Sequence, residues 1–332
     1  MKTAVVLFNM GGPDSLAAVR PFLFNLFNDK AIVGAPTPIR WCLAQYVSRK
    51  REAHAQDIYR QIGGASPLLE QTERQARALK AQLGDGYECF VAMRYWHPFI
   101  EETVRQVEAF APDRVLLLPL YPQYSSTTTG SSFTGWENCA VHLPKPARIC
   151  CYPELLGLAQ AFAEGLHRAL IDSKLFGRAR VLFSAHGLPK YLIDRGDPYR
   201  HQVERTAQAI LTALGEPVDS AICFQSRVGP MEWIGPETKA EIETAGAAHK
   251  PVIVVPLAFV SEHSETLVEL DIEYKSLALK AGVPAYWRVP TPIDHPAFIA
   301  GLADLVKNAK EGTHPGGPSC QGSRFVCPGA LS

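Results

Sequence analysis

The sequence has no excess of charge of one sign, because 33 lysine and arginine residues balance 33 aspartate and glutamate residues among its 332. A neutral chain produces no long-range field that would gather nucleic acid or anionic lipid, so we expect no nucleic-acid partner. No apolar run approaches the roughly 18 residues of a membrane span, and residues 4–8 are too short a run for a signal peptide. We therefore expect a cytoplasmic protein whose mature chain begins at Met1.

Cysteine is scarce as well, with eight residues in the chain. That number is too small for a disulfide scaffold, and a cytoplasmic protein would keep its thiols reduced. A phosphate-binding glycine loop is also lacking: residues 9–13 read NMGGP, and Pro13 removes a backbone donor that a phosphate would need. We expect no nucleotide to bind.

The chain does contain continuous apolar runs rich in β-branched residues, which are typical of strands covered on both faces. Stretches with helical spacing, such as residues 67–83 and 199–214, separate these runs and indicate parallel βαβ units. The length fits roughly two domains. The runs lie at residues 5–8, 89–91, 115–118, 181–183, 222–224 and 252–255.

The order of these runs repeats along the chain. Val6 to Phe8 followed by Gly12 corresponds to Val181 to Phe183 followed by Gly187, and Arg94 corresponds to Arg227. The sequence therefore predicts an α/β fold with two similar Rossmann-like domains, whose parallel sheets face a common cleft. We expect domains at 1–150 and 151–294, a helix over 295–311 that packs back on them, and an irregular tail at 312–332.

The first half is longer than the second, which predicts an insert at about residues 20–60. This insert is rich in large apolar residues from Phe22 to Tyr46, beside Arg49, Lys50 and Arg51. Surface loops are normally polar. The insert could cap a large apolar ligand, touch a membrane or pack as ordinary core.

Candidate catalytic residues follow two of the expected strands. His186 ends the fourth run, where an imidazole can accept a proton or bind a metal near neutral pH. After the last run, Glu262, Glu265, Glu269 and Glu273 fall on one face of a helix turning about 100° per residue. No lysine or arginine lies between them, so we interpret the row as a path for a cation or for protons, with His263 and Glu265 meeting His186 across the cleft.

Aromatic and basic residues gather at the other strand ends. They include Arg94 and Tyr95 after the second run, Trp233 after the fifth, and Phe259 after the last. Such a cleft suits a flat apolar ring that bears carboxylates. These features together suggest a tetrapyrrole and a metal.

The motifs from about Val5 to Val306 resemble those of the ferrochelatase family, whose members insert ferrous iron into protoporphyrin. They read NMGGP at 9–13, YRQIGGASP at 59–67, RYWHP at 94–98, YPQYSSTTTGSS at 121–132, SAHGLP at 184–189 and SEHSETLVELDIEY at 261–274. The resemblance implies a chelatase-like fold, an apolar lip that meets membrane lipid, and a long helix with a π-type turn. It implies ferrous iron and protoporphyrin IX as substrates, and no redox cofactor or nucleotide for the chemistry.

The resemblance also implies roles for residues at matching positions. His186 would accept pyrrole protons or contact the metal, Glu265 would be its partner across the ring, and Glu269 and Glu273 would continue the path. Met10 resembles the residue of members that use protoporphyrin rather than coproporphyrin. The other implied pocket residues are Arg51, Tyr59, Ser66, Arg94, Tyr95 and Trp233.

Some family members hold a [2Fe–2S] cluster with four cysteines, three of them near the C-terminus. This tail has only two cysteines, Cys320 and Cys327. Cys150 and Cys151 could complete a set of four cluster ligands, with Cys139 as a spare candidate. The other reading is a disordered tail with inert thiols. For the whole chain, two other functions stay open: a module that binds a metal tetrapyrrole or siderophore without catalysis, and a chelatase that inserts cobalt or nickel into another tetrapyrrole.

Overall fold

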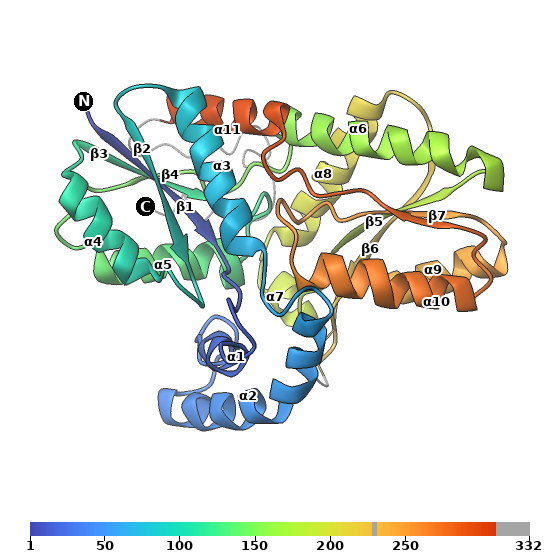
Figure 1. Cartoon of the computed structure of the whole chain (residues 1–332), viewed down its shortest axis with the longest axis horizontal. Coiled ribbons are helices and arrows are strands. Elements are labelled where there is room, and N and C mark those ends of the chain that lie inside the picture. The colour runs from blue at the N-terminus through green and yellow to red at the C-terminus, as the bar shows by residue number, and fades with distance from the viewer. Residues whose placement is uncertain (228–230, 310–332) are drawn as a thin grey trace.

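The computed structural model describes residues 1–227 and 231–309 and contains two four-stranded parallel sheets (Figure 1). The strand order is β2-β1-β3-β4 in the first sheet and β6-β5-β7-β8 in the second. Two sheets with the same order confirm the expected α/β fold of two similar Rossmann-like halves. The strands are β1 (Thr3–Asn9), β2 (Tyr87–Met93), β3 (Arg114–Pro119), β4 (Ala147–Arg148), β5 (Arg180–His186), β6 (Asp219–Gln225), β7 (Val252–Val255) and β8 (Tyr286–Arg288).

All six apolar runs lie inside strands, and β1 and β7 are buried along their whole length. Helices cover both faces of each sheet (Figure 1), which explains why the runs are continuous rather than alternating. The sequence did not predict β4 and β8, because they are short edge strands. The α-helices are α1 (Val19–Phe27), α2 (Thr37–Arg60), α3 (Leu68–Leu83), α4 (Ile100–Phe110), α5 (Ser131–Cys139), α6 (Leu156–Ser173), α7 (Lys190–Asp194), α8 (Tyr199–Leu214), α9 (Thr238–Ala247), α10 (Lys275–Lys280) and α11 (Pro296–Asn308).

The strand registers show how the two halves correspond. Asn9 lies opposite Met93 at the end of β1, as His186 lies opposite Gln225 at the end of β5. Met10 is therefore the counterpart of Gly187, and Ser226 rather than Arg227 is the counterpart of Arg94. The sequence paired Gly12 with Gly187, and this pairing is wrong. The hydrogen-bonded strand partners define how the two halves correspond, whereas a glycine in the turn after a strand does not.

One apolar cluster extends across both halves of the protein. A single buried cluster includes Leu7 of β1, Val181 of β5, Phe162 of α6 and Leu302 of α11. Helix α11 packs against both α6 and α3, so it joins the halves. The division at residues 150 and 151 stays a prediction, and the expected tail at 312–332 lies outside the described residues.

The insert forms α1 and α2, which project from the sheets at the bottom of Figure 1. Within the described part of the chain, no helix has both the length and the apolar character that crossing a membrane requires.

Candidate active site

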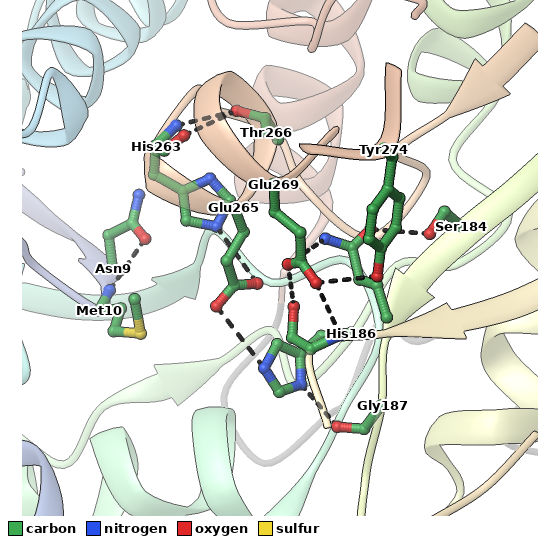
Figure 2. A network of polar contacts seen from close by, with 12 residues as sticks. Asn9, Met10, Ser184, His186, Gly187, His263, Glu265, Thr266, Glu269 and Tyr274 are labelled. Atoms are coloured by element: carbon green, nitrogen blue, oxygen red, sulfur yellow. Dashed lines mark hydrogen bonds and ion pairs between the residues drawn. The ribbon is translucent and has the colours of Figure 1, made fainter. Parts of the chain in front are cut away.

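His186 is the last residue of β5, and its imidazole lies at the carboxyl edge of the second sheet (Figure 2). Its Nδ1 is 2.5 Å from the carbonyl oxygen of Gly187. Because a carbonyl can only accept, Nδ1 carries the proton in this contact. In the neutral ring, Nε2 is then the nitrogen with a lone pair, and Nε2 lies 3.6 Å from Oε1 of Glu265.

Gly187 permits the close packing behind this imidazole. A Cβ atom at Gly187 would lie 2.9 Å from the carbonyl oxygen of Gln225 and 3.2 Å from the ring of Trp233. The absence of a side chain lets the Trp233 ring approach, with its centroid 6.4 Å from that of His186. Trp233 therefore belongs to the surroundings of His186.

Glu265 lies between two imidazoles. Its second oxygen, Oε2, is 3.7 Å from Nε2 of His263, and both imidazole contacts have ion-pair distances rather than hydrogen-bond distances. Burial opposes the charge of this carboxylate, but its interactions with the imidazoles of His186 and His263 outweigh burial and lower the pKa of Glu265 to about 2. Glu265 is thus an anion at neutral pH, although its side chain is only 24% exposed.

Glu269 is held by several donors within the same network. Its carboxylate accepts hydrogen bonds from the hydroxyl of Tyr274 at 2.8 Å, the backbone N–H of Ser226 at 3.1 Å and the side-chain amide of Gln225 at 3.2 Å. The Ser226 hydroxyl also donates to it. Burial and the nearby charge of Glu265 nevertheless raise the pKa of Glu269, so the two carboxylates differ in proton affinity.

The acidic residues stand on a π-helix, Glu265–Tyr274, rather than on an α-helix. A π-helix bonds residues five apart, and the contact of Glu269 with Tyr274 has that spacing. Because each turn is wider than four residues, side chains four apart drift around the axis instead of stacking. The expectation of one narrow face is therefore wrong: Glu265 and Glu269 lie beside His186 (Figure 2), whereas Glu273 is exposed to solvent.

Glu262 is not part of an unpaired acidic row. It lies before the π-helix, only 7% exposed, and its Oε1 is 2.9 Å from Nη1 of Arg288 and 2.9 Å from the backbone nitrogen of Thr291. Arg288 also pairs with Asp271 at 2.7 Å. The sequence argument failed because the basic partner comes from β8, beyond the helix.

Arg94 and Tyr95 form a second group with Asp29. The Arg94 guanidinium lies 2.9 Å from Oδ2 of Asp29, and the Tyr95 hydroxyl donates to the same oxygen at 2.9 Å. Asp29 was missed by the sequence analysis, although it is the only carboxylate among residues 21–46. That isolation within an apolar insert was the signal that could have revealed it.

The loop after β1 packs closely on this second group. The backbone nitrogen of Tyr95 donates to the carbonyl of Met10 at 2.9 Å. Gly11 has a φ of +84°, and a Cβ atom there would lie 3.0 Å from the nitrogen of Trp96. Ser66 lies against Gly12, where a Cβ atom would be 2.4 Å from its hydroxyl oxygen. Close packing against its neighbours therefore shapes this loop.

Three aromatic residues complete the surroundings of the imidazoles. The Phe259 ring is 4.6 Å from the His263 ring, centroid to centroid. Tyr59, the penultimate residue of α2, is buried near Ser264 and Glu265, and burial raises the pKa of its phenol to about 12. Tyr199 was missed by the sequence analysis: it is buried, with Glu265 close by and the backbone of His186 as a hydrogen-bond partner.

The insert carries the remaining candidates. The Arg51 guanidinium lies 5.8 Å from the centre of the Phe27 ring, inside the insert. Large apolar side chains on α2 are exposed by 41% to 61% of their surface, which argues against ordinary core packing there. We call these residues the lip patch: Ile39, Trp41, Leu43 and Tyr46.

Cys150 and Cys151 are buried, and their sulfur atoms are 3.6 Å apart. The amide of Gln202 contacts Cys151 at 3.4 Å. Cys139 packs against the same apolar cluster as Cys150 and Cys151, and its sulfur is 3.6 Å from the carboxylate of Glu101. Cys320 and Cys327 fall outside the described residues, and among the described residues no group of three or more metal-binding side chains is present.

Comparison with known proteins decides the family. The sequence model of the ferrochelatase family matches residues 2–310. A ferrochelatase of Phenylobacterium zucineum is 50% identical over 99% of this chain and 96% of its own length. A ferrochelatase of Caulobacter vibrioides is 52% identical over 93% of this chain and 90% of its own length. The chain belongs to the ferrochelatase family. Its members insert ferrous iron into protoporphyrin in haem biosynthesis, so the chain is a metal-inserting lyase.

A solved structure supports the fold independently. The enzyme CbiX, described as the terminal enzyme of sirohaem biosynthesis in denitrifying bacteria, aligns with a TM-score of 0.51 and 14% identity over 93% of this chain and all of its own. This likeness shows the chelatase-like fold alone. Family membership rules out the non-catalytic binding module, and it favours ferrous iron over the cobalt or nickel alternative.

Proposed function

We propose that His186 accepts the pyrrole protons of protoporphyrin IX through Nε2 while Glu265 stabilises the imidazolium that results. One observation carries this proposal: Nδ1 contacts the Gly187 carbonyl, which leaves the lone pair on Nε2, the nitrogen that lies on the side of Glu265. A fixed tautomer is what a positioned general base requires. The same lone pair can contact the entering metal.

Insertion of Fe²⁺ replaces two pyrrole N–H bonds by metal–nitrogen bonds, and two protons leave. One imidazole can take only one proton at a time, so each proton must move on before the next is accepted. Glu269, whose pKa is raised, is a better proton acceptor than Glu265, whose pKa is about 2. We assign Glu269 as the next acceptor and exposed Glu273 as the exit to solvent, with His263 helping to keep Glu265 ionised.

The porphyrin would lie between the two groups of side chains. Trp233 and Phe259 offer aromatic surfaces beside the imidazoles, and Met10 offers a soft apolar contact at the end of β1. Arg94 and Arg51 are the cations suited to the two porphyrin carboxylates. Tyr59, Ser66 and Tyr95 complete the proposed pocket.

We further propose that the lip patch contacts membrane lipid, so that the protein is cytoplasmic and peripheral to the membrane. The patch is apolar and exposed, and the neighbouring Arg49 and Lys50 on α2 are also exposed. Apolar side chains beside basic ones on a helix surface favour binding at an anionic interface. Protoporphyrin is itself apolar, so a lip at the membrane would receive it directly.

A [2Fe–2S] cluster fits Cys150 and Cys151. Two sulfurs bound to one tetrahedral metal at about 2.3 Å lie roughly 3.8 Å apart, and the observed separation is 3.6 Å. Cys320 and Cys327 would supply the other two ligands. Because metallation transfers no electrons, the cluster would tie the tail to the domain rather than take part in the reaction. Anaerobic purification followed by iron and sulfide analysis tests this: a protein without sulfide, or an intact cluster in the Cys320→Ser, Cys327→Ser variant, would contradict it.

The activity is tested by mixing the purified protein with protoporphyrin IX and ferrous iron without oxygen and following the porphyrin spectrum. We expect conversion to haem at a rate proportional to the amount of protein. Conversion of protoporphyrin with cobalt or nickel but not with iron would favour the alternative metals instead.

A further inference from the structure

Asp29 connects the insert to the Arg94 and Tyr95 group. Its Oδ2 accepts hydrogen bonds from the Tyr95 hydroxyl at 2.9 Å and the Ser131 hydroxyl at 2.5 Å, and lies 2.9 Å from Nη2 of Arg94. Its Oδ1 accepts from the backbone nitrogen of Ala31 at 2.8 Å. With 8% of its surface exposed, Asp29 is a buried carboxyl group whose two oxygens both have partners.

These contacts fix the orientation of the Arg94 guanidinium. Nε donates to the Ser131 hydroxyl at 2.7 Å, and Nη2 faces Asp29, so two edges of the planar group are held within the protein. In the part of the chain that the structure describes, Nη1 takes part in no hydrogen bond or ion pair, and the side chain is 27% exposed. Nη1 is therefore the edge that a ligand carboxylate can reach.

Tyr95 supports the same guanidinium. It is only 4% exposed, and its ring centre lies 5.4 Å from the guanidinium carbon of Arg94. Its hydroxyl is committed to Asp29. Tyr95 thus lies behind Arg94, and Asp29 holds both side chains.

We propose that Asp29 is a positioning residue for porphyrin recognition: from the loop between α1 and α2, it holds Arg94 in the orientation that binds a porphyrin carboxylate. The inference rests on the proposed role of Arg94. If Asp29 has this role, the insert controls how the first half of the protein recognises porphyrin. Packing of the insert against Arg94 and binding of the porphyrin carboxylate are then coupled through the side chain of Asp29.

The test is a double-mutant cycle of Asp29→Asn and Arg94→Gln, with porphyrin affinity measured by fluorescence in the absence of iron. We expect each single variant to weaken protoporphyrin binding about tenfold, and the double variant to be no weaker than Arg94→Gln alone. Protoporphyrin dimethyl ester, which lacks ionised carboxylates, should bind wild type and Asp29→Asn with affinities within about twofold. The matched control is Asp57→Asn, which removes an exposed carboxylate on α2 that pairs with Arg60 and should change affinity less than twofold.

An Asp29→Asn effect that adds fully to that of Arg94→Gln, or that is equally large for the dimethyl ester, would overturn the inference in favour of a general structural role. If Asp29→Asn does not fold, Ser131→Ala tests the same claim, because Ser131 bonds both Asp29 and Arg94. Unchanged binding in Arg94→Gln with normal metallation would overturn this inference and the proposed role of Arg94, but it would leave the proposed metal insertion at His186 intact. A wild-type protein that binds porphyrin without metallating it would contradict the proposed function and leave this inference intact.

Discussion

Replacing Arg288 by methionine should destabilise the protein strongly, because Arg288 neutralises Glu262 inside the fold. Arg288 and Glu262 side chains are each 9% exposed, and their contact is 2.9 Å long. Breaking a buried pair by removing one partner costs about 3–5 kcal/mol. The second partner, Asp271, is 35% exposed, so its lost contact adds at most about 1 kcal/mol. We expect Arg288→Met to lose about 3–5 kcal/mol of unfolding free energy at pH 7, measured by urea denaturation.

Removing the charge of Glu262 as well should restore most of this loss. The Glu262→Gln, Arg288→Met variant has no uncompensated buried charge and should fall about 1–2 kcal/mol below wild type, through lost hydrogen bonds. The pH dependence gives a second check. In wild type burial would raise the pKa of Glu262, but Arg288 and neighbouring hydrogen bonds lower it, so this carboxylate stabilises the fold above its unfolded pKa and the contribution is lost as pH falls.

Without Arg288, only the hydrogen bonds from Thr266 and Thr291 oppose burial, so we expect the pKa of Glu262 to lie higher than in wild type. The deficit of Arg288→Met should therefore be largest at neutral pH and shrink as pH falls toward about 4. Arg60→Met, which removes an exposed pair with Asp57, serves as the control and should cost less than about 1 kcal/mol. A loss below 1 kcal/mol in Arg288→Met, or a double variant no more stable than the single one, would refute the reasoning.

Three further predictions concern the site and the lip patch. Because the pKa of Glu269 is raised, kcat in wild type should fall as pH drops through that raised value. Glu269→Gln should have a lower kcat and should lack this fall. A series of kcat measurements against pH in which the fall is unchanged would remove Glu269 from the proton path. Replacing Ile39 and Trp41 by serine should reduce binding to anionic liposomes at least threefold and change the melting temperature by less than about 2 °C. A large drop in melting temperature with unchanged liposome binding would instead indicate that these side chains pack in the core. Gly187→Ala should lower kcat about tenfold or more by displacing Trp233 from His186, and normal turnover in a stopped assay would show that the close approach is dispensable.

The sequence predicted the sheets well because burial on both faces leaves continuous apolar runs. Strands β1, β3 and β7 carry that signal, whereas β4 and β8 lie at sheet edges and have too few residues to show it. The position of His186 was predictable for the same reason, since it directly follows such a run. The exact correspondence of the halves was not, because it depends on ladder register.

The partners of the site were harder to predict because they are distant in sequence. Glu262 was grouped with the other acids since 100° spacing assumes an α-helix, and its partner Arg288 belongs to a strand the sequence did not reveal. Asp29 lies 65 positions before Arg94, and no periodic pattern links an insert loop to a strand end. Tyr199 begins a helix and gives no sign of its burial near Glu265.

The measurement that tests the central claim most directly is the comparison of wild type with His186→Ala, using turnover of ferrous iron and protoporphyrin together with porphyrin affinity measured without iron. If Nε2 of His186 accepts the pyrrole protons, kcat should fall by about 10²–10⁴ while porphyrin affinity and the melting temperature stay close to those of wild type. A His186→Ala variant that retains near-normal kcat would contradict the account.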